Sequence, residues 1–434
     1  MITQEEYVSR RQQVAKLLPE DSVAVIPAAS EFLRNGDAHY RFRQDSDFYY
    51  LTGSNEPDGL LIITSKPHCE SILFNLPKNL DIEQWTGTRL GQTGAKETMG
   101  VSDAFSIDDC AAMLPDFLSD RHAVFTFMGR YPHWDEKIAQ AWKRVKNLIR
   151  SGIKAPDAFH DLTPIISELR LFKSKAELEL MRHAADASVI GHRRAMAKAK
   201  EAQNEYELEA ELIYAFMQKG CRSVAYDPIV AGGQNACILH YTDNNQPLSK
   251  SDLMLIDAGG EYHNYAADIT RTFPLSGQFS PEQKALYDLV LGAQKKGIDQ
   301  VKPGNPWHEI QETMVHHLTD GLVQLRILKG DVDSLIEQQA YRDFYMHSSG
   351  HWLGLDVHDC GAYRLKNVWR ELEPGMVLTV EPGIYIKPGQ DVDKRWQGIG
   401  IRIEDDIVVT ENGFENLTSA LPVEVEEIEA IVRG

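Results

Sequence analysis

The chain contains 434 residues, of which 43% are hydrophobic and 25% charged, a composition typical of a folded protein with two or three domains. Its 45 Lys and Arg residues against 64 Asp and Glu residues give a formal net charge of −19. This balance argues against binding to nucleic acids or anionic membranes, since both require a basic face. No apolar run approaches the roughly 18 residues needed to span a bilayer.

The N-terminus and the cysteines indicate the compartment. Residues 1–19 are charged and lack the apolar core of a signal peptide. The five cysteines form no Cys-x-x-Cys pair, and their odd number and wide spacing indicate reduced thiols. We therefore predict a cytoplasmic protein with no membrane partner and no nucleic-acid partner.

The first part of the chain alternates short apolar runs with helical stretches. The pattern Thr3-x-x-Glu6 predicts a capped helix that ends near Leu18. This alternation predicts an α/β domain with a mixed sheet, followed by a linker within residues 151–164, where Gly and Pro gather. The expected elements are strands at 22–27, 59–64, 71–75 and 123–128 and a helix at 135–149.

The second part of the chain opens with another capping pattern, Ser174-x-x-Glu177, which predicts a helix to about Lys200. Helices and antiparallel hairpins in separate blocks indicate an α+β domain instead of a doubly wound one. We therefore predict a smaller N-terminal α/β domain, 1–170, and a larger C-terminal α+β domain, 171–434. The expected C-terminal elements are helices at 205–219, 281–300 and 306–328 and strands at 228–231, 253–258, 266–273, 376–380 and 399–410.

Two carboxylates flank a predicted hairpin in the C-terminal domain. An apolar strand ends in Asp257, and Asp268 begins the run that leads to Phe273. If the hairpin turns at Tyr262–His263, the two aspartates face each other with Cβ atoms about 5 Å apart, where like charges are destabilising. A divalent metal between them would remove the repulsion. The alternative is that one aspartate lies in the turn while the other caps a strand.

Three further features strengthen the metal interpretation. His347, His351 and His358 lie close together in a glycine-containing stretch, which is less ordinary than a single solvated loop histidine. Another apolar strand ends in a carboxylate, Glu381, and is followed by Pro-Gly. Glu404 lies two residues after Arg402 in an otherwise apolar strand, so it either pairs with this arginine or binds a metal.

Four carboxylates at the ends of apolar strands raise one another's pKa values if they cluster without a counter-charge. Two divalent cations would balance their charge. With one imidazole added, the ligands form an oxygen-rich dinuclear site, which favours Mn²⁺ and also admits Zn²⁺, Co²⁺ or Fe²⁺. Two such ions about 3.5–4 Å apart can share a hydroxide and polarise a carbonyl, the arrangement used in aminopeptidases.

In their order along the chain, Asp257, Asp268, His351, Glu381 and Glu404 resemble the metal-ligand set of the pita-bread metallopeptidases. This family includes methionine aminopeptidase, prolidase and aminopeptidase P. The resemblance extends over nearly the whole chain and is greatest to the bacterial aminopeptidase P (Xaa-Pro aminopeptidase) branch. The segments that carry it are residues 42–53, 238–242, 255–259, 268–274, 351–358 and 381–386.

The resemblance implies a C-terminal pita-bread catalytic domain and a role for each candidate residue. The five residues would be metal ligands, with Asp268 and Glu404 bridging two ions, and Glu381 would also carry the proton of the attacking hydroxide. His240 and His358 would hold the substrate and the tetrahedral intermediate. His347 would line the proline pocket, and Arg402 and Tyr385 would orient the residues around it.

The resemblance also implies that the N-terminal domain supplies the substrate-end wall and the contacts of a homo-oligomer, a dimer or tetramer. Asp37, Arg150 and, across a subunit contact, Trp85 would belong to this part of the site. Each has a simpler interpretation: Asp37 as a turn residue, Arg150 as a solvated helix end and Trp85 as a local core aromatic.

The sequence thus predicts an aminopeptidase that uses two divalent metal ions to release the N-terminal residue from peptides with proline in second position. One alternative is a prolidase limited to Xaa-Pro dipeptides. The others are a non-catalytic pita-bread binding module and a metal-free, creatinase-like hydrolase. Retention of all five ligand types and three histidines argues against the last two.

Overall fold

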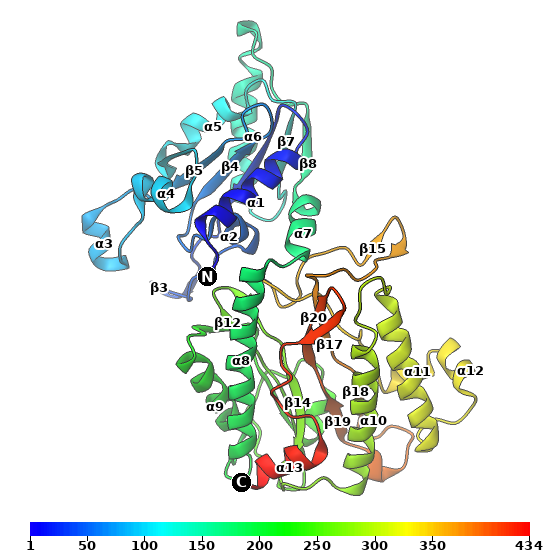
Figure 1. Ribbon diagram of the computed structural model, residues 1–434. Helices are drawn as coiled ribbons and strands as arrows, with labels where there is room; N and C mark the ends of the chain where they lie inside the picture. The colour runs from blue at the N-terminus through cyan, green and yellow to red at the C-terminus, as the bar shows by residue number, and fades with distance from the viewer. The chain divides into compact units, whose positions relative to one another are not determined.

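Apolar strands in the first 170 residues form a mixed six-stranded sheet, in the order β6-β5-β4-β1-β7-β8. The central strand β1 pairs with β4 in antiparallel and with β7 in parallel orientation. The computed structural model describes all 434 residues, which divide into two units, Met1–Arg170 and Leu171–Gly434 (Figure 1). The six strands are β1 (Ser22–Pro27), β4 (Leu60–Thr64), β5 (Ser71–Asn75), β6 (Asp103–Ser106), β7 (Ala123–Thr126) and β8 (Ala158–Asp161).

Helices α5 and α6 bury an apolar face in the N-terminal core with the central strands. The sequence did not predict helices α2 to α5. It also placed a linker within 151–164, which is wrong, because β8 lies there as an edge strand paired with β7. The helices of this unit are α1 (Gln4–Leu17), α2 (Ser46–Thr52), α3 (Leu80–Thr86), α4 (Gly91–Met99), α5 (Cys110–Leu118), α6 (Pro132–Lys146) and α7 (Thr163–Leu171), and a small hairpin joins β2 (Leu33–Asn35) to β3 (Ala38–His39).

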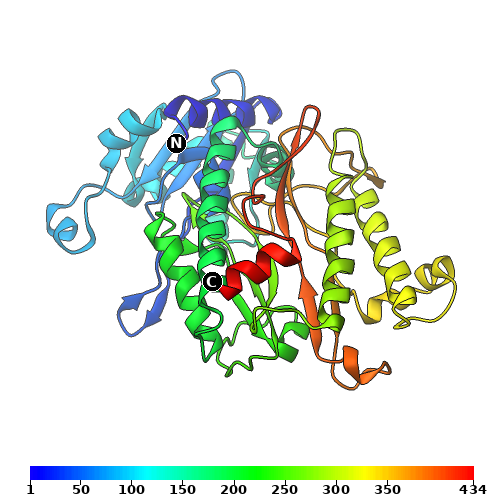
Figure 2. The same ribbon diagram turned by 60° about the horizontal axis from the view of Figure 1, so that its bottom comes forward.

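The C-terminal unit consists of small antiparallel sheets with helices on both sides. Figures 1 and 2 show α8 and α9 on one side of the strands and α10 and α11 on the other. The capping box at Ser174 and Glu177 is formed as predicted. The helices are α8 (Lys175–Lys198), α9 (Glu205–Gln218), α10 (Pro281–Ile298), α11 (His308–Gln324), α12 (Val332–Glu337) and α13 (Val425–Arg433).

The strands of this unit form one large apolar core with the helices. Two three-stranded sheets, β10-β11-β14 and β17-β20-β21, and the pair β18-β19 carry the residues of interest. The strands are β9 (Ser223–Val224), β10 (Ile229–Gly232), β11 (Leu253–Asp257), β12 (Gly260–Tyr262), β13 (Tyr265–Ala266), β14 (Thr270–Pro274), β15 (Arg364–Leu365), β16 (Val368–Trp369), β17 (Val377–Val380), β18 (Gly383–Ile386), β19 (Ile399–Arg402), β20 (Asp405–Thr410) and β21 (Gly413–Asn416).

The hairpin between β11 and β14 turns one residue later than expected. His263 and Asn264 occupy the turn with φ values of 48° and 65°, as a two-residue hairpin turn requires, and Asn tolerates this region well. Asp257 therefore pairs with Thr270, and the predicted register that placed it opposite Asp268 is wrong. Asp268 instead lies in the irregular segment between β13 and β14.

The single strand expected over 399–410 is two strands. β19 ends at Arg402 and β20 begins at Asp405, so that Arg402 and Glu404 do not share one face of a continuous strand. At the break, the backbone N–H of Glu404 donates to the carbonyl of Thr270, 3.0 Å away. The break thereby joins Glu404 to the hairpin that carries the two aspartates. In this chain, no helix has the length and apolar character to cross a membrane.

Candidate metal centre and catalytic site

A cavity of about 790 Å³ opens among the strand ends of the C-terminal unit. It gathers carboxylates, histidines and a wall of aromatic and aliphatic side chains. Such concave sites with a few convergent polar groups are typical of ligand and substrate binding. Its lining residues are Tyr226, Asp227, Ile229, Leu239, His240, Thr242, Asp257, Asp268, Trp307, His347, Ser348, Gly350, His351, Val357, His358, Tyr363, Trp369, Glu381, Arg402 and Glu404.

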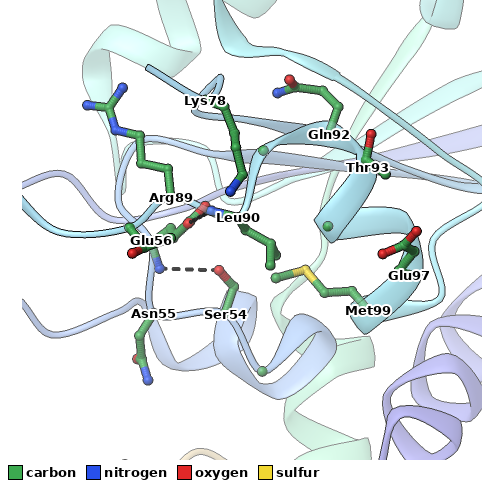
Figure 3. Close-up of a pocket in the computed structure, with 14 residues that line it drawn as sticks. Ser54, Asn55, Glu56, Lys78, Arg89, Leu90, Gln92, Thr93, Glu97 and Met99 are labelled. Carbon is green, nitrogen blue, oxygen red and sulfur yellow. Dashed lines mark hydrogen bonds between the residues drawn. The ribbon is translucent and has the colours of Figure 1, made fainter. Parts of the chain in front are cut away.

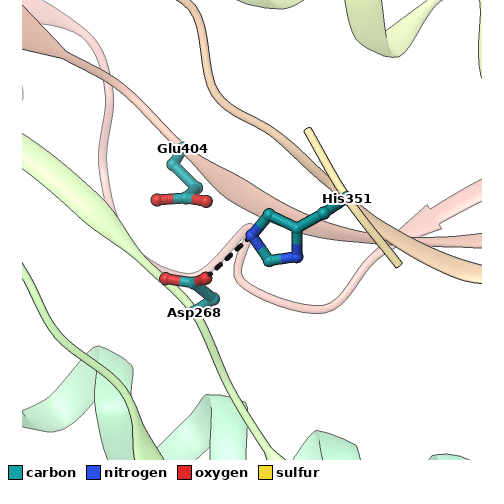
Figure 4. Close-up of side chains that lie close together, drawn as sticks. All are labelled: Asp268, His351 and Glu404. Atoms are coloured by element: carbon teal, nitrogen blue, oxygen red, sulfur yellow. Dashed lines mark ion pairs between the residues drawn. The ribbon is translucent and has the colours of Figure 1, made fainter. Parts of the chain in front are cut away.

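The structure brings the five predicted metal ligands to this cavity. Asp257 ends β11, Glu381 follows β17, and Glu404 lies at the break between β19 and β20. Asp268, His351 and Glu404 place one ligand atom each within 4.8 Å of one another (Figure 4). Five residues from distant parts of the chain therefore converge at one point.

Hydrogen bonds fix the orientation of His351. Its Nδ1 lies 3.0 Å from the carbonyl of Trp352, and its Nε2 lies 3.3 Å from Asp268 Oδ2 and 3.8 Å from Glu381 Oε1. A backbone partner on one ring nitrogen leaves the other directed at the carboxylates, as in metal-binding histidines. Although burial disfavours the charged ring, the hydrogen bond and charge of Asp268 raise the pKa of His351 to about 9.

The four carboxylates carry more negative charge than their surroundings offset. Burial raises the pKa of Glu381 to about 7, and burial with the neighbouring carboxylates raises the pKa of Glu404 well above its usual range. Arg402 is the arginine of the cavity, and its Nη2 pairs with Asp257 Oδ2 at 2.7 Å. The sequence left open an ion pair between Glu404 and Arg402, but the arginine's ion pair is with Asp257.

Buried like charges without sufficient counter-charge are costly. Divalent cations would offset the excess, and oxygen donors with one imidazole suit hard to borderline ions such as Mn²⁺ or Zn²⁺. The residues present therefore fit a site for divalent metal ions.

Three more predicted residues form a network beside the carboxylates. His347 Nε2 lies 2.8 Å from Tyr385 Oη, and Arg402 Nη1 donates to the same hydroxyl at 2.9 Å. His347 Nδ1 lies 3.6 Å from Glu381 Oε2. Burial lowers the pKa of His347 to about 4, so the ring is a neutral hydrogen-bonding group.

His240 and His358 line the more exposed part of the cavity. The ring centroid of His358 lies 4.4 Å from that of His351 in an edge-to-face contact. Burial lowers the pKa of His358. Both histidines can reach a ligand that enters the cavity, because neither side chain is buried.

Asp37, Arg150 and Trp85 belong to the other unit, and each is exposed. Asp37 occupies the turn between β2 and β3, and Arg150 lies in the short 3₁₀ turn Ile149–Ser151. Trp85 is 88% exposed on α3, which excludes the alternative that it is a local core aromatic. The substrate-end and assembly roles of these three residues remain predictions.

Several residues in and beside the cavity were not predicted from the sequence. The hydroxyl of Tyr226 hydrogen-bonds both Asp257 and Asp268. Thr270 Oγ1 donates to Glu404 Oε2 at 2.6 Å. For Tyr226, the one signal in the sequence is that the segment 226–228 leads into an apolar strand. The pairing of Ile229 in β10 with Asp257, which brings Tyr226 to the site, is seen only in the structure. Nothing in the spacing of Trp307, Tyr363 and Trp369 indicated the aromatic wall.

A second cavity, of about 860 Å³, lies in the N-terminal unit (Figure 3). One oxygen of its Glu56 is engaged: Oε1 accepts the backbone N–H of Leu90 at 2.6 Å, just before α4. Lys78, Arg89 and Glu97 also line it, but no histidine or cysteine does. The chemistry that the sequence predicts therefore resides in the C-terminal cavity.

Residues 179–411 match the model of metallopeptidase family M24, and residues 7–125 match that of the aminopeptidase P N-terminal domain. The Xaa-Pro aminopeptidase of Escherichia coli K12 is 44% identical over 99% of this chain and 98% of its own length. That of Haemophilus influenzae is 43% identical over the same shares.

Solved structures agree with this likeness. The aminopeptidase PepP of Pseudomonas aeruginosa superposes with a TM-score of 0.98 at 46% identity, covering 100% of this chain and 98% of its own. E. coli aminopeptidase P in complex with the inhibitor Pro-Leu gives a TM-score of 0.96 at 44% identity, with the same coverage. A zinc-substituted form of that enzyme with product gives 0.97.

Fold and site together define a metal-dependent peptidase. The chain belongs to metallopeptidase family M24, in its aminopeptidase P branch. The family, the pita-bread fold with an N-terminal α/β domain, and the hydrolase class predicted from the sequence are thus confirmed.

Proposed function

We propose the following reaction and residue roles for the chain. It is an Xaa-Pro aminopeptidase: it hydrolyses the bond between the first residue of a peptide and a proline in second position. The observation that carries this function is the convergence of Asp257, Asp268, His351, Glu381 and Glu404 in one cavity beside a hydrogen-bonded His347, Tyr385 and Arg402.

The enzyme uses divalent metal ions, and we propose two per chain, Mn²⁺ in the native enzyme. Asp257, Asp268, His351, Glu381 and Glu404 would hold them, with Asp268 and Glu404 shared between both. When bound, such ions polarise the scissile carbonyl and acidify the attacking water. The excess of buried negative charge supports more than one ion, since Arg402 offsets only one of the four carboxylates and a single divalent ion would leave the cluster negative.

Glu381 carries the proton in this proposal. It follows an apolar strand, and Pro-Gly fixes the backbone immediately after it. A carboxylate with one oxygen on the metal side can take a proton from the attacking water on its other oxygen and deliver it to the leaving imino nitrogen. Its Oε2 is the oxygen nearer to His347, at 3.6 Å.

The histidines and the arginine network position the peptide. His240 and His358, which remain accessible, donate to the substrate carbonyl and to the tetrahedral oxygen as it forms. His347, held by Tyr385, lines the space for the proline ring, and Arg402 holds Tyr385 in turn. An Xaa-Pro bond has no N–H, so an apolar wall such as Ile229, Leu239 and Val357 leaves no donor unpaired.

The N-terminal unit would close the substrate end of the site in an oligomer, with Asp37 and Arg150 near the peptide and Trp85 at the subunit contact. The large exposed surface of Trp85 supports this assembly. Sedimentation analysis tests it: we expect Trp85→Ala to shift the chain from a dimer or tetramer toward monomer.

Paired substrates test the function itself. We expect an Xaa-Pro-Yaa tripeptide to be cut between Xaa and Pro in the presence of Mn²⁺, and Xaa-Ala-Yaa far more slowly. Equal rates on the two would indicate a general aminopeptidase. Activity confined to the Xaa-Pro dipeptide would indicate a prolidase instead.

A further inference from the structure

Tyr226 is not one of the five proposed metal ligands, but its hydroxyl hydrogen-bonds two of them. Its hydroxyl oxygen lies 2.5 Å from Asp257 Oδ1 and also hydrogen-bonds Asp268 Oδ1. The residue lies just before β10, and the pairing of β10 with β11 places it beside the end of the strand that carries Asp257. Tyr226 carries no charge to offset the two carboxylates, so it is not a counter-ion.

Each aspartate is held on both of its oxygens. Asp257 has Oδ1 on Tyr226 and Oδ2 on Arg402 Nη2, 2.7 Å away. Asp268 has Oδ1 on Tyr226 and Oδ2 near His351 Nε2, 3.3 Å away. The Tyr226 hydroxyl is thus a hydrogen-bonding partner that both carboxylates share.

A phenol has a single hydrogen to donate. When both aspartates are ionised, only one of them can receive it, and the other would face the hydroxyl oxygen with its own lone pairs. Without the hydroxyl, the two like charges would separate unless a cation replaced it. The contact therefore keeps the two carboxylates converged only when a proton or a cation offsets one of their charges, which ties this arrangement to metal binding.

We propose that Tyr226 is a positioning residue for the metal centre: its hydroxyl holds Asp257 and Asp268 together and thereby raises the affinity for the second divalent ion. This inference rests on the ligand roles proposed above. Partners of this kind, which orient a metal ligand without binding the metal, typically change metal affinity by about 10- to 100-fold.

Tyr226→Phe tests the proposal because it removes the hydroxyl and keeps the ring. A matched control is Tyr287→Phe in the same unit, which removes a buried hydroxyl that donates to the carbonyl of Val423 at 2.7 Å and does not line the cavity. Metal-free protein is titrated with Mn²⁺ by calorimetry. Electron paramagnetic resonance then shows whether the bound ions form a spin-coupled pair.

We expect the wild-type chain and Tyr287→Phe to bind two Mn²⁺ ions alike. Tyr226→Phe should bind the second ion about 10- to 100-fold more weakly and lose the coupled-pair signal at stoichiometric metal, while its metal-free thermal unfolding stays close to wild type. Wild-type affinity for both ions in Tyr226→Phe would overturn the role of Tyr226. Fewer than two ions on the wild type would instead overturn the dinuclear function.

A second measurement needs no destabilising change. Replacing Tyr226 alone by 3-fluorotyrosine keeps the ring and hydroxyl and adds a ¹⁹F label. Because the two carboxylates that the hydroxyl holds are the ones proposed to bind the ions, the ¹⁹F resonance should move during titration with Zn²⁺, up to two equivalents. A resonance that stays unchanged throughout would contradict the proposal even if Tyr226→Phe failed to fold.

Discussion

Both units of the molecule bury clustered carboxylates, but only one cluster is balanced by the protein's own cations. In the N-terminal unit, Asp47 pairs with Arg170 at 2.6 Å and with Arg130 at 2.7 Å. Asp45 pairs with Arg130 at 3.1 Å and accepts the Tyr131 hydroxyl at 2.9 Å. Two acids meet two arginines, and the network closes on itself.

The C-terminal cluster has four carboxylates and one arginine, with His351 as a further cation when protonated. Directly after Glu404, Asp405 shows the balanced arrangement again, since Arg271 pairs with it at 2.7 Å. The difference separates two uses of buried charge. In a closed network each buried charge keeps its partner, and removing that partner is costly, whereas an open network requires an ion from outside and is a candidate site for chemistry.

Breaking the closed network should affect stability alone. Arg170→Ala leaves Asp47 buried with only its bond to Arg130, and loss of one partner of a buried pair costs about 3–5 kcal/mol. We expect urea unfolding to report a loss of that size, with kcat and the Mn²⁺ content of the folded protein unchanged. If Arg170→Ala unfolded like wild type or lost metal, the claim that the N-terminal cluster affects only stability would be wrong.

A buried neutral base makes the C-terminal unit sensitive to acid. Burial lowers the pKa of His192 to about 4, while the unfolded chain protonates it near 6.5. As the pH falls from about 6.5 to 4, only the unfolded state gains this proton, so stability declines by about 3 kcal/mol and then levels off. His192→Gln should remove this component from a plot of unfolding free energy against pH. If the unfolding free energies of wild type and His192→Gln changed in parallel with pH, this role of His192 would be contradicted.

A substitution at Glu381 tests whether this residue carries a proton in the reaction or only helps to hold the metal ions. Glu381→Gln keeps the shape and one metal-binding oxygen but cannot carry a proton. We expect kcat to fall by at least about 100-fold with little change in KM. Excess Mn²⁺ should not restore the rate. Recovery to near wild-type kcat in excess metal would show that Glu381 only holds the ion.

The smallest effect is expected from a change at Thr270, which contacts the C-terminal cluster of four carboxylates and Arg402. Its Oγ1 donates to Glu404 Oε2 and accepts from Arg402 Nε at 3.2 Å. Thr270→Val keeps the shape but leaves Glu404 without this donor, so we expect about a 10-fold loss of Mn²⁺ affinity. Calorimetric titration measures it, and unchanged affinity would remove Thr270 from the metal centre.

The sequence predicted the elements whose signals are local. Apolar runs that end in carboxylates correctly located the strands before Asp257 and Glu381, and the capping box at Ser174 located α8. These features depend on neighbouring residues alone. They were sufficient to place every residue of the open cluster in the right element or beside it.

What the sequence could not provide depends on residues far apart in the chain. The hairpin register shifted because the turn adopted its two positive φ values at His263 and Asn264. The break at Glu404 arises because its backbone pairs with Thr270. Tyr226 reaches the site only through the pairing of β10 with β11. No spacing rule reveals such contacts, since each depends on how separate strands meet.

The most direct test of the requirement for external cations is to count the metal ions that each chain binds. After dialysis against a chelator, the chain should be inactive. Titration with Mn²⁺ should restore activity in proportion to the metal bound, up to two ions per chain. Every ion should bind in the C-terminal cluster. A quadruple variant, Asp257→Asn, Asp268→Asn, Glu381→Gln and Glu404→Gln, should therefore retain none. Full activity with less than about a tenth of an ion per chain would contradict the claim that the open cluster requires external cations.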